Sequence, residues 1–180
     1  VVYLKDEEIA VMTKDNFEVF DFNGNKIKKK IHEVEWTIEQ AEKEGYPHFT
    51  IKEIYEQEKV IKAALLQDNN VIDSIAGKVK AAKQVIFAAC GTSYHSGLIG
   101  KYLLAKLAGI QSQVVIASEF QNSLLNTINE GTVIIAISQS GETADVLHAV
   151  RNAKAKGAKV FSIVNVMGSS LTRESDGILY

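Results

Sequence analysis

Two glycine-containing segments of the sequence are rich in hydroxyl groups. The first, AACGTS at residues 88–93, and the second, ISQSGET at residues 137–143, each follow an apolar run and lead into a helix-like stretch. The first turn of a helix presents unpaired N–H groups and a partial positive charge, and glycine lets an anion approach the backbone. Since Ser and Thr hydroxyls donate hydrogen bonds without titrating, each segment has the composition of an uncharged phosphate site.

Side by side, the two segments would hold one phosphate group from several directions. The alternative is that the hydroxyls are only N-caps, for which Ser and Thr are preferred residues. Each segment carries more hydroxyls than a cap needs, so the pattern favours an anion site over the caps. In such a site Thr92 would face the rest of the ligand. The expected ligand-binding residues are Thr92, Ser93, Ser138, Gln139, Ser140, Gly141 and Thr143.

Other phosphate-binding motifs are missing from the sequence. A P-loop needs a lysine after its second glycine, and the pair Gly91 and Gly97 has neither that lysine nor the right spacing. The dinucleotide fingerprint GxGxxG follows neither apolar run, which argues against NAD or FAD. Neither hydroxyl-rich segment contains Arg or Lys. We therefore expect no cofactor, and a small-metabolite monophosphate as the ligand rather than a triphosphate.

Patterns for catalysis or metal binding are weak. The four histidines show no ligand spacing, so no metal site is expected, although His95 lies next to the first hydroxyl-rich segment. Cys90 ends an apolar run and is interpreted as a packed side chain in preference to a nucleophile. Glu142 and Asp145 lie in the expected first turn of a helix, where the helix dipole alone explains acidic residues. No catalytic residue is predicted in this segment.

The second half of the sequence alternates short apolar strands with amphipathic helices. Strands are predicted over residues 85–89, 113–117, 132–137, 159–164 and 177–180. Helices are predicted over residues 96–107, 143–156 and 170–174. Uniformly apolar strands indicate a parallel sheet covered on both faces. The predicted fold class is therefore α/β, a doubly wound, flavodoxin-like parallel sheet that binds ligands at the carboxyl ends of its strands.

The first third of the sequence is rich in β-branched and aromatic residues. Strands are predicted over residues 1–4, 9–13, 17–22 and the alternating stretch 26–36. Asn23-Gly24 is the strongest hairpin signal, because both residue types accept a positive φ.

The composition changes after Trp36. Residues 37–44 are charged and permit a short helix, and Tyr46-Pro47 marks a break that we take as the domain boundary. Capping-box spacing at Thr50 predicts a helix through residue 65, and a second helix is predicted over residues 71–81. Another capping-box pattern begins at Ser118.

The overall composition narrows the classes of partner. The chain has 180 residues, of which 46% are hydrophobic, and its 20 Lys and Arg nearly balance its 22 Asp and Glu. This balance gives no basic field for nucleic acid or an anionic membrane, and the apolar runs are far below the roughly 18 residues of a membrane span. A single cysteine excludes an internal disulfide and fits a reducing, cytoplasmic compartment.

Five runs carry a resemblance to a known family. They are ACGTSY at 89–94, ASEF at 117–120, ISQSGETAD at 137–145, GSSLTRESD at 168–176 and HFTIKEIYEQ at 48–57. With them the chain resembles the sugar isomerase (SIS) domain and, more narrowly, the isomerizing glutamine–fructose-6-phosphate aminotransferases, or glucosamine-6-phosphate synthases. The run at 48–57 is the most specific, because generic SIS proteins lack it. Glu58 departs from the family, which usually has proline there, and this affects only local helix geometry.

The resemblance implies a three-part organisation. Residues 1–45 resemble the C-terminal end of the glutaminase domain, a β-rich tail. Residues 46–82 resemble the linker and leading helices, and residues 83–180 the first SIS domain, truncated. Both ends of the sequence look like strands already under way, so we expect a piece of a longer protein.

The resemblance also implies an activity for that longer protein. The family transfers ammonia from glutamine to fructose 6-phosphate, forming glucosamine 6-phosphate and glutamate. Ser93, Ser138, Gln139, Ser140 and Thr143 would then grip the sugar phosphate. Thr92 would contact the sugar. The family's glutaminase nucleophile, an N-terminal cysteine, has no match here, and its acid–base and Schiff-base residues belong to a second SIS domain.

This segment is therefore expected to bind the sugar phosphate without turning it over, within an enzyme that forms a homodimer. A non-catalytic SIS sensor of sugar phosphates is the alternative interpretation. The third interpretation is a relative of the amino-sugar deaminases that lacks glutaminase activity, which the β-rich head disfavours.

Overall fold

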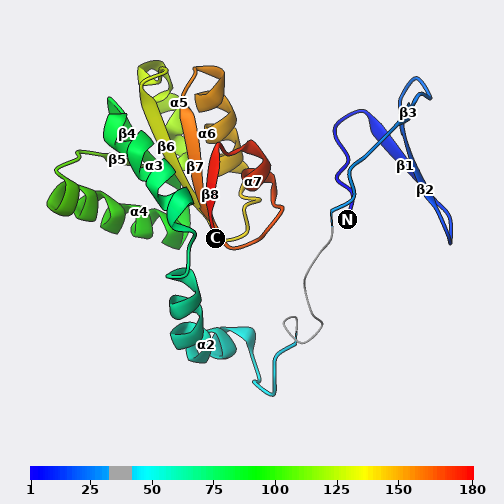
Figure 1. Cartoon of the computed structure of the whole chain (residues 1–180), viewed down its shortest axis with the longest axis horizontal. Helices are drawn as coiled ribbons and strands as arrows, with labels where there is room; N and C mark the ends of the chain where they lie inside the picture. Colours follow the sequence, from blue (N-terminus) through cyan, green and yellow to red (C-terminus); the bar gives the residue numbers. More distant parts are fainter. Residues whose placement is uncertain (33–41) are drawn as a thin grey trace. The chain divides into compact units, whose positions relative to one another are not determined.

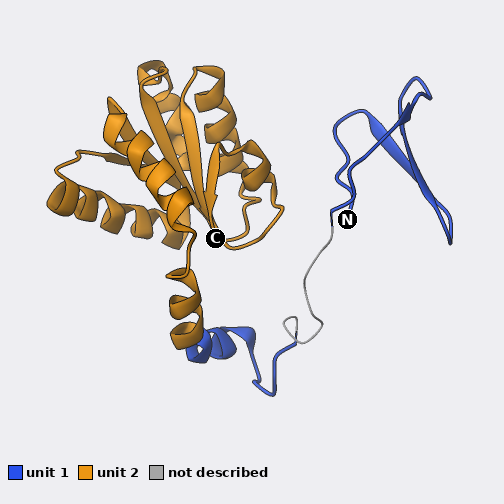
Figure 2. Ribbon diagram, viewed as in Figure 1, with its two compact units in different colours: residues 1–56 blue, residues 57–180 orange. Residues whose placement is uncertain are grey.

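The computed structural model describes residues 1–32 and 42–180 of the chain (Figure 1). Its contacts divide the chain into two compact units, Val1–Glu56 and Gln57–Tyr180 (Figure 2). The predicted short helix at 37–44 and the last part of the predicted strand at 26–36 fall largely outside the described residues.

The first unit contains a three-stranded antiparallel sheet. Its strands are β1 (Glu8–Met12), β2 (Phe17–Asp21) and β3 (Lys26–Ile27), in the order β1-β2-β3. The Asn23-Gly24 hairpin prediction is confirmed, since Gly24 has a φ of 82° and the Asp21 N–H donates to the Asn25 carbonyl at 3.0 Å.

Two strand predictions in this unit are wrong. Residues 1–4 form no strand. The His32 N–H donates to the Val1 carbonyl at 2.8 Å, but this pairing does not extend into a ladder of hydrogen bonds. The long strand expected from residue 26 ends at Ile27, and residues 28–32 are irregular.

Helix α2 (Phe49–Ala64) crosses the division between the units. It begins one residue before Thr50, so the predicted capping box lies inside the helix instead of at its start. Within the first unit, the buried Lys52 anchors this helix: its Nζ lies 3.0 Å from Glu44 Oε1 and donates to the Glu42 carbonyl at 2.6 Å.

The second unit is a five-stranded, all-parallel sheet with helices on both faces (Figure 1). Its strand order, β5-β4-β6-β7-β8, is that of a flavodoxin-like sheet, so the predicted doubly wound α/β fold is confirmed. The elements are α3 (Asn69–Ala81), β4 (Gln84–Ala89), α4 (Gly91–Leu103), β5 (Gln113–Ile116), α5 (Phe120–Ser123), β6 (Thr132–Ser138), α6 (Ala144–Ala155), β7 (Lys159–Val164), α7 (Ser170–Glu174) and β8 (Gly177–Leu179).

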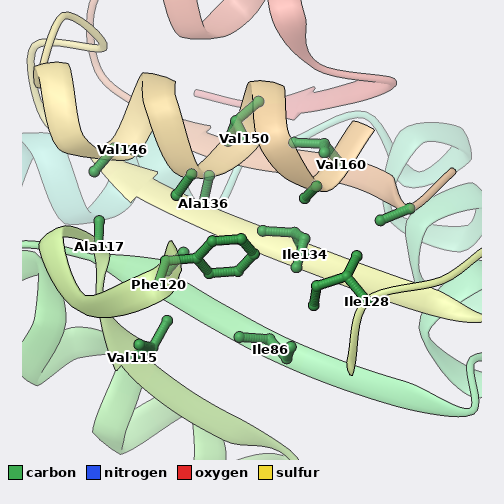
Figure 3. Close-up of a cluster of buried hydrophobic side chains, with 14 of the residues drawn as sticks. Ile86, Val115, Ala117, Phe120, Ile128, Ile134, Ala136, Val146, Val150 and Val160 are labelled. Atoms are coloured by element: carbon green, nitrogen blue, oxygen red, sulfur yellow. The ribbon is translucent and has the colours of Figure 1, made fainter. Parts of the chain in front are cut away.

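Side chains of each central strand alternate between two apolar layers, which explains their uniformly apolar sequences. On one face, Ile86 and Ile134 pack with Phe120 and with Val146 and Val150 of α6 (Figure 3). A second cluster contains the alternate residues of the same strands, together with side chains of α3 and of the turn that follows α4. The strands are therefore buried from both sides, as the parallel pairing requires.

Helix α4 lies close to the sheet because it carries glycine where it crosses Phe87. A Cβ at Gly97 would lie 3.2 Å from the Phe87 Cβ, and one at Gly100 would lie 2.9 Å from the Phe87 ring. Beyond this contact, α3 and the π-helical turn Leu104–Ala108 border an apolar groove of about 640 Å³. The close contact at the two glycines fixes α4, and with it the residues at its N-terminus.

The core assignment can be tested by truncating one buried and one exposed isoleucine. Ile134 is fully buried, so Ile134→Ala is expected to lower the free energy of unfolding by about 2–5 kcal/mol, because a cavity remains. Ile99 on α4 is 62% exposed, and Ile99→Ala is expected to change it by less than about 0.5 kcal/mol. Urea denaturation followed by circular dichroism measures both. Equal losses in the two variants would contradict this core.

Candidate functional site

The two hydroxyl-rich segments lie together at one edge of the sheet. Strands β4 and β6 are parallel neighbours in which Ala89 is paired with Ile137, so both segments leave the sheet at the same level. Neighbouring strands lie about 4.8 Å apart. The strand order reverses between β4 and β6, since β5 follows on one side and β7 on the other. This is the topological switch point at which open α/β sheets bind ligands.

The first segment turns from strand to helix within one residue. Cys90 is extended, with φ −126° and ψ 156°, and α4 begins at Gly91, whose φ is 57°. The helix thus starts five residues before the predicted Ser96. Thr92 and Ser93 consequently lie in its first turn, with Thr92 exposed and Ser93 half-buried.

The second segment passes from the end of β6, at Ser138, into the β6–α6 loop, residues 139–143, and its hydroxyls are bonded within the segment. Ser138 Oγ lies 3.0 Å from Thr143 Oγ1 and accepts the Gly141 N–H at 3.1 Å. Ser140 Oγ accepts the Glu142 N–H at 3.2 Å. The loop is therefore ordered by its own side chains, with Ser138 buried and Ser140 half-buried.

Neither long helix at this edge has a side-chain N-cap among the described residues. Cys90 holds the N-cap position of α4 and Thr143 that of α6, and neither side chain bonds its helix. Asp68, by contrast, accepts the Asn70 N–H at the start of α3. The hydroxyls of the two segments are thus not serving as N-caps. The first-turn N–H groups of α4 and α6 lack acceptors within their own helices.

Gly141 fits its place through both its backbone and its missing side chain. Its φ is 66°, in the left-handed region that favours glycine. A Cβ there would lie 2.1 Å from Ser169 Oγ and 2.9 Å from Val164 Cγ2. The β6–α6 loop therefore rests directly on the segment that follows β7.

Glu142 has a role that sequence reasoning missed. Its Oε1 accepts the Ser170 N–H at 2.7 Å, at the start of α7, whereas the sequence pattern alone points to the helix dipole of α6. Burial raises the pKa of Glu142, but the Ser170 N–H, the Ser170 hydroxyl and the Arg173 charge outweigh it, and the net pKa is lowered. Ser170 lies 28 residues away, so no local pattern could have revealed the pair.

The other candidates stay at the margin of the site. His95 is exposed, with its ring against Tyr94 at a centroid distance of 5.7 Å. Cys90 is half-buried and packs against the core cluster, in agreement with its interpretation as a packed side chain. In the described ranges, no group of three or more His, Cys, Asp or Glu could hold a metal ion. The helices within those ranges are also too short or too polar to cross a bilayer.

Comparison with known proteins agrees with this fold. The SIS domain family matches residues 78–180, and the chain belongs to that family. The relatives it matches are named glutamine–fructose-6-phosphate aminotransferase [isomerizing]. The Thermococcus kodakarensis protein is 47% identical over 181 residues, and the Clostridium tetani protein is 47% identical over 190. Each match covers the whole chain but only 30% and 31% of the relative, so the chain spans about a third of their length.

Solved structures also resemble this chain. The C-terminal domain of glucosamine–fructose-6-phosphate aminotransferase from Francisella tularensis has a TM-score of 0.68 and 38% identity, covering 77% of this chain and 40% of that one. The sugar isomerase domain of an RpiR transcription factor from Sphaerobacter thermophilus has a TM-score of 0.64 and 19% identity, covering 72% of this chain and 73% of that one. At that identity the second likeness shows the fold alone.

Alanine substitutions at two glycines with nearly equal φ distinguish the cost of backbone strain from the cost of steric contact in the β6–α6 loop. Gly109→Ala is expected to destabilise the chain by about 1–2 kcal/mol, because φ is 65° there but no atom lies within 4 Å of a new Cβ. Gly141→Ala adds the clash with Ser169 and is expected to cost about 1–3 kcal/mol more. Thermal unfolding of both variants measures the difference, and equal shifts would contradict the observed contact.

Proposed function

We propose that this chain is part of an isomerizing glutamine–fructose-6-phosphate aminotransferase, which makes glucosamine 6-phosphate and glutamate. In this proposal the edge between β4 and β6 binds the sugar phosphate. The observation that supports this binding site is that α4 and α6 both begin at the switch point without a hydrogen bond from the side chain of their N-cap residue. The 47% identity over the whole chain supports the enzyme.

The proposed phosphate contacts use only neutral donors. The first-turn N–H groups of α4 and α6 would point at the phosphate, with added hydrogen bonds from the side chains of Ser93, Ser138, Ser140 and Thr143. Gln139 is exposed and could contribute its side-chain amide. Ser138 and Thr143 bond each other, so the phosphate would replace a neighbouring hydroxyl as their partner.

The rest of the substrate would extend over the N-terminus of α4. Thr92 is exposed there and would contact the sugar, while Gly141, with its left-handed φ of 66°, would shape the loop backbone beside the ligand. Fructose 6-phosphate and glucosamine 6-phosphate share the phosphate group, so both are proposed ligands. The residues that perform the chemistry would lie elsewhere in the longer protein, and no catalytic residue is proposed in this chain.

The proposed organisation follows the same resemblance. Residues 1–45 would end a glutaminase domain, residues 46–82 would link it to the SIS domain, and residues 83–180 would belong to that SIS domain. A homodimer is proposed for the longer enzyme. The aminotransferase relatives match residues 1–77 as well as the SIS-domain range, which favours the enzyme over a stand-alone sugar-phosphate sensor.

Two serines on α4 offer a matched test of the phosphate site. Ser93 lies in the first turn, whereas Ser96 lies about one turn further along and bonds the Thr92 carbonyl at 3.4 Å. Ser93→Ala is expected to weaken fructose 6-phosphate binding about tenfold, because a hydrogen bond to a charged group is lost. Ser96→Ala should leave it unchanged.

The measurement is an NMR titration of the backbone amides with fructose 6-phosphate. Shifts are expected at residues 91–93 and 138–143. Inorganic phosphate should move the amides of residues 138–143 and compete with the sugar phosphate. Absence of shifts at millimolar ligand in the wild-type chain would show that the site is wrongly assigned.

A further inference from the structure

Helix α7 begins against the β6–α6 loop. Its N-cap residue, Ser169, makes no side-chain cap, and within the described part of the chain its buried Oγ has no hydrogen-bond partner. The loop takes the first two N–H groups of α7 instead. The Ser170 N–H donates to Glu142 Oε1 at 2.7 Å, and the Leu171 N–H donates to the Gly141 carbonyl at 3.0 Å. Two consecutive loop residues thus cap a helix from another part of the chain.

Arg173 also bonds the residues at the start of α7. Its Nη2 donates to Ser170 Oγ at 2.9 Å, and its Nη1 donates to the Gly168 carbonyl at 2.5 Å. The Arg173 charge also lies close enough to Glu142 to favour the ionised carboxylate. The start of α7 is therefore held by hydrogen bonds with two side chains, those of Glu142 and Arg173.

The direction of the Glu142 carboxylate matters for an anion at this edge. Glu142 is adjacent to Gly141 and Thr143 in the chain, and a free carboxylate there would repel a phosphate. Its Oε1 is engaged by the Ser170 N–H, at the positive end of α7 and near Arg173. The negative charge is thus partly balanced.

We propose that Glu142 is a positioning residue for the sugar-phosphate site, which holds residues 138–143 in the conformation that receives the phosphate. This inference rests on the proposed function. Among the described residues, three hydrogen bonds tie residues 139–142 to other segments: Asn165 N–H to the Gln139 carbonyl at 3.2 Å, and the two bonds to α7. Only the bond at Glu142 involves a side chain, so it is the one that substitution can remove.

Three variants distinguish positioning from general stabilisation. Glu142→Ala removes the acceptor and is expected to weaken fructose 6-phosphate binding about tenfold. Glu142→Gln keeps an oxygen that can accept the Ser170 N–H, so binding should return to within about threefold of wild type. Glu174→Ala breaks the ion pair with Arg151, whose Nε lies 3.1 Å from Glu174 Oε1. That pair ties α7 to α6 without touching the loop, so binding should stay unchanged.

Amide hydrogen exchange tests the loop without any ligand. The Gly141 N–H is bonded to the buried Ser138 Oγ and should exchange slowly in the wild-type chain. Glu142→Ala is expected to speed its exchange about tenfold, whereas Glu174→Ala should not.

Two results would overturn the inference: Glu142→Ala binding the sugar phosphate as wild type does, or unchanged Gly141 exchange in that variant. A wild-type chain that binds no sugar phosphate would overturn the proposed function instead, and the exchange rates would then decide alone whether Glu142 holds the loop.

The contribution of the Glu142 charge to stability depends on pH in a defined direction. Because the pKa of Glu142 is lowered in the folded chain, the stability from its charge is present above the ordinary value of 4.5 and is lost as pH falls through the lower folded value. The Tm advantage of wild type over Glu142→Gln is therefore expected to shrink over that acidic range. A constant difference would contradict a charged Glu142 in this role.

Discussion

Helices α4 and α6 both begin at one edge of the parallel sheet, and the rest of the candidate site depends on that arrangement. It results from the pairing of β4 with β6, which brings residues 88–93 and 137–143 to the same level. The link after β4 is a single residue, Cys90, so α4 starts at the edge itself. Gly97 and Gly100 then keep α4 against Phe87 and hold its N-terminus in place.

The β6–α6 loop is the second half of the edge, and its shape is fixed by packing as well as by hydrogen bonds. Gly141 presses against Ser169 with no room for a Cβ, and its carbonyl accepts the Leu171 N–H. The hydroxyl pair of Ser138 and Thr143 leaves α6 without a side-chain cap from Thr143. Among the described residues, the contact that orders the loop therefore also keeps the Thr143 side chain from capping α6, so in the proposed site the order of the loop and the binding of an anion would be linked.

Much of this fold follows from local sequence patterns. Uniformly apolar runs predicted the parallel strands to within one or two residues, and the switch-point rule then placed the two hydroxyl-rich segments together. Capping boxes at Thr50 and Ser118 were wrong, because α2 begins before the first and Ser118 lies within the 3-10 turn Ala117–Glu119. Helix α4 starts earlier than its periodicity suggests, because its first five residues, GTSYH, are mostly polar and give no apolar repeat.

Features that depend on distant partners could not be predicted. The Glu142 carboxylate bonds an amide 28 residues away, and the tight fit of Gly141 depends on Ser169 in the same distant segment. The ligand-binding roles of all seven candidate residues, from Thr92 to Thr143, also remain predictions, as do the domain boundaries at residues 45 and 82.

The balanced charge of the chain bears on how such a site would discriminate among anions. A lysine attracts any anion as a point charge, whereas N–H and hydroxyl donors reward only an anion whose oxygens fall along their bond directions. With a net charge of −2 and no Arg or Lys in either segment, selectivity must come from the placement of donors. That placement depends on the packed Gly141 and on the capping of α7 by Glu142. In the proposed site an acidic residue would therefore favour the binding of an anion, because it would act on the position of the donors while its own carboxylate bonds the Ser170 N–H of α7.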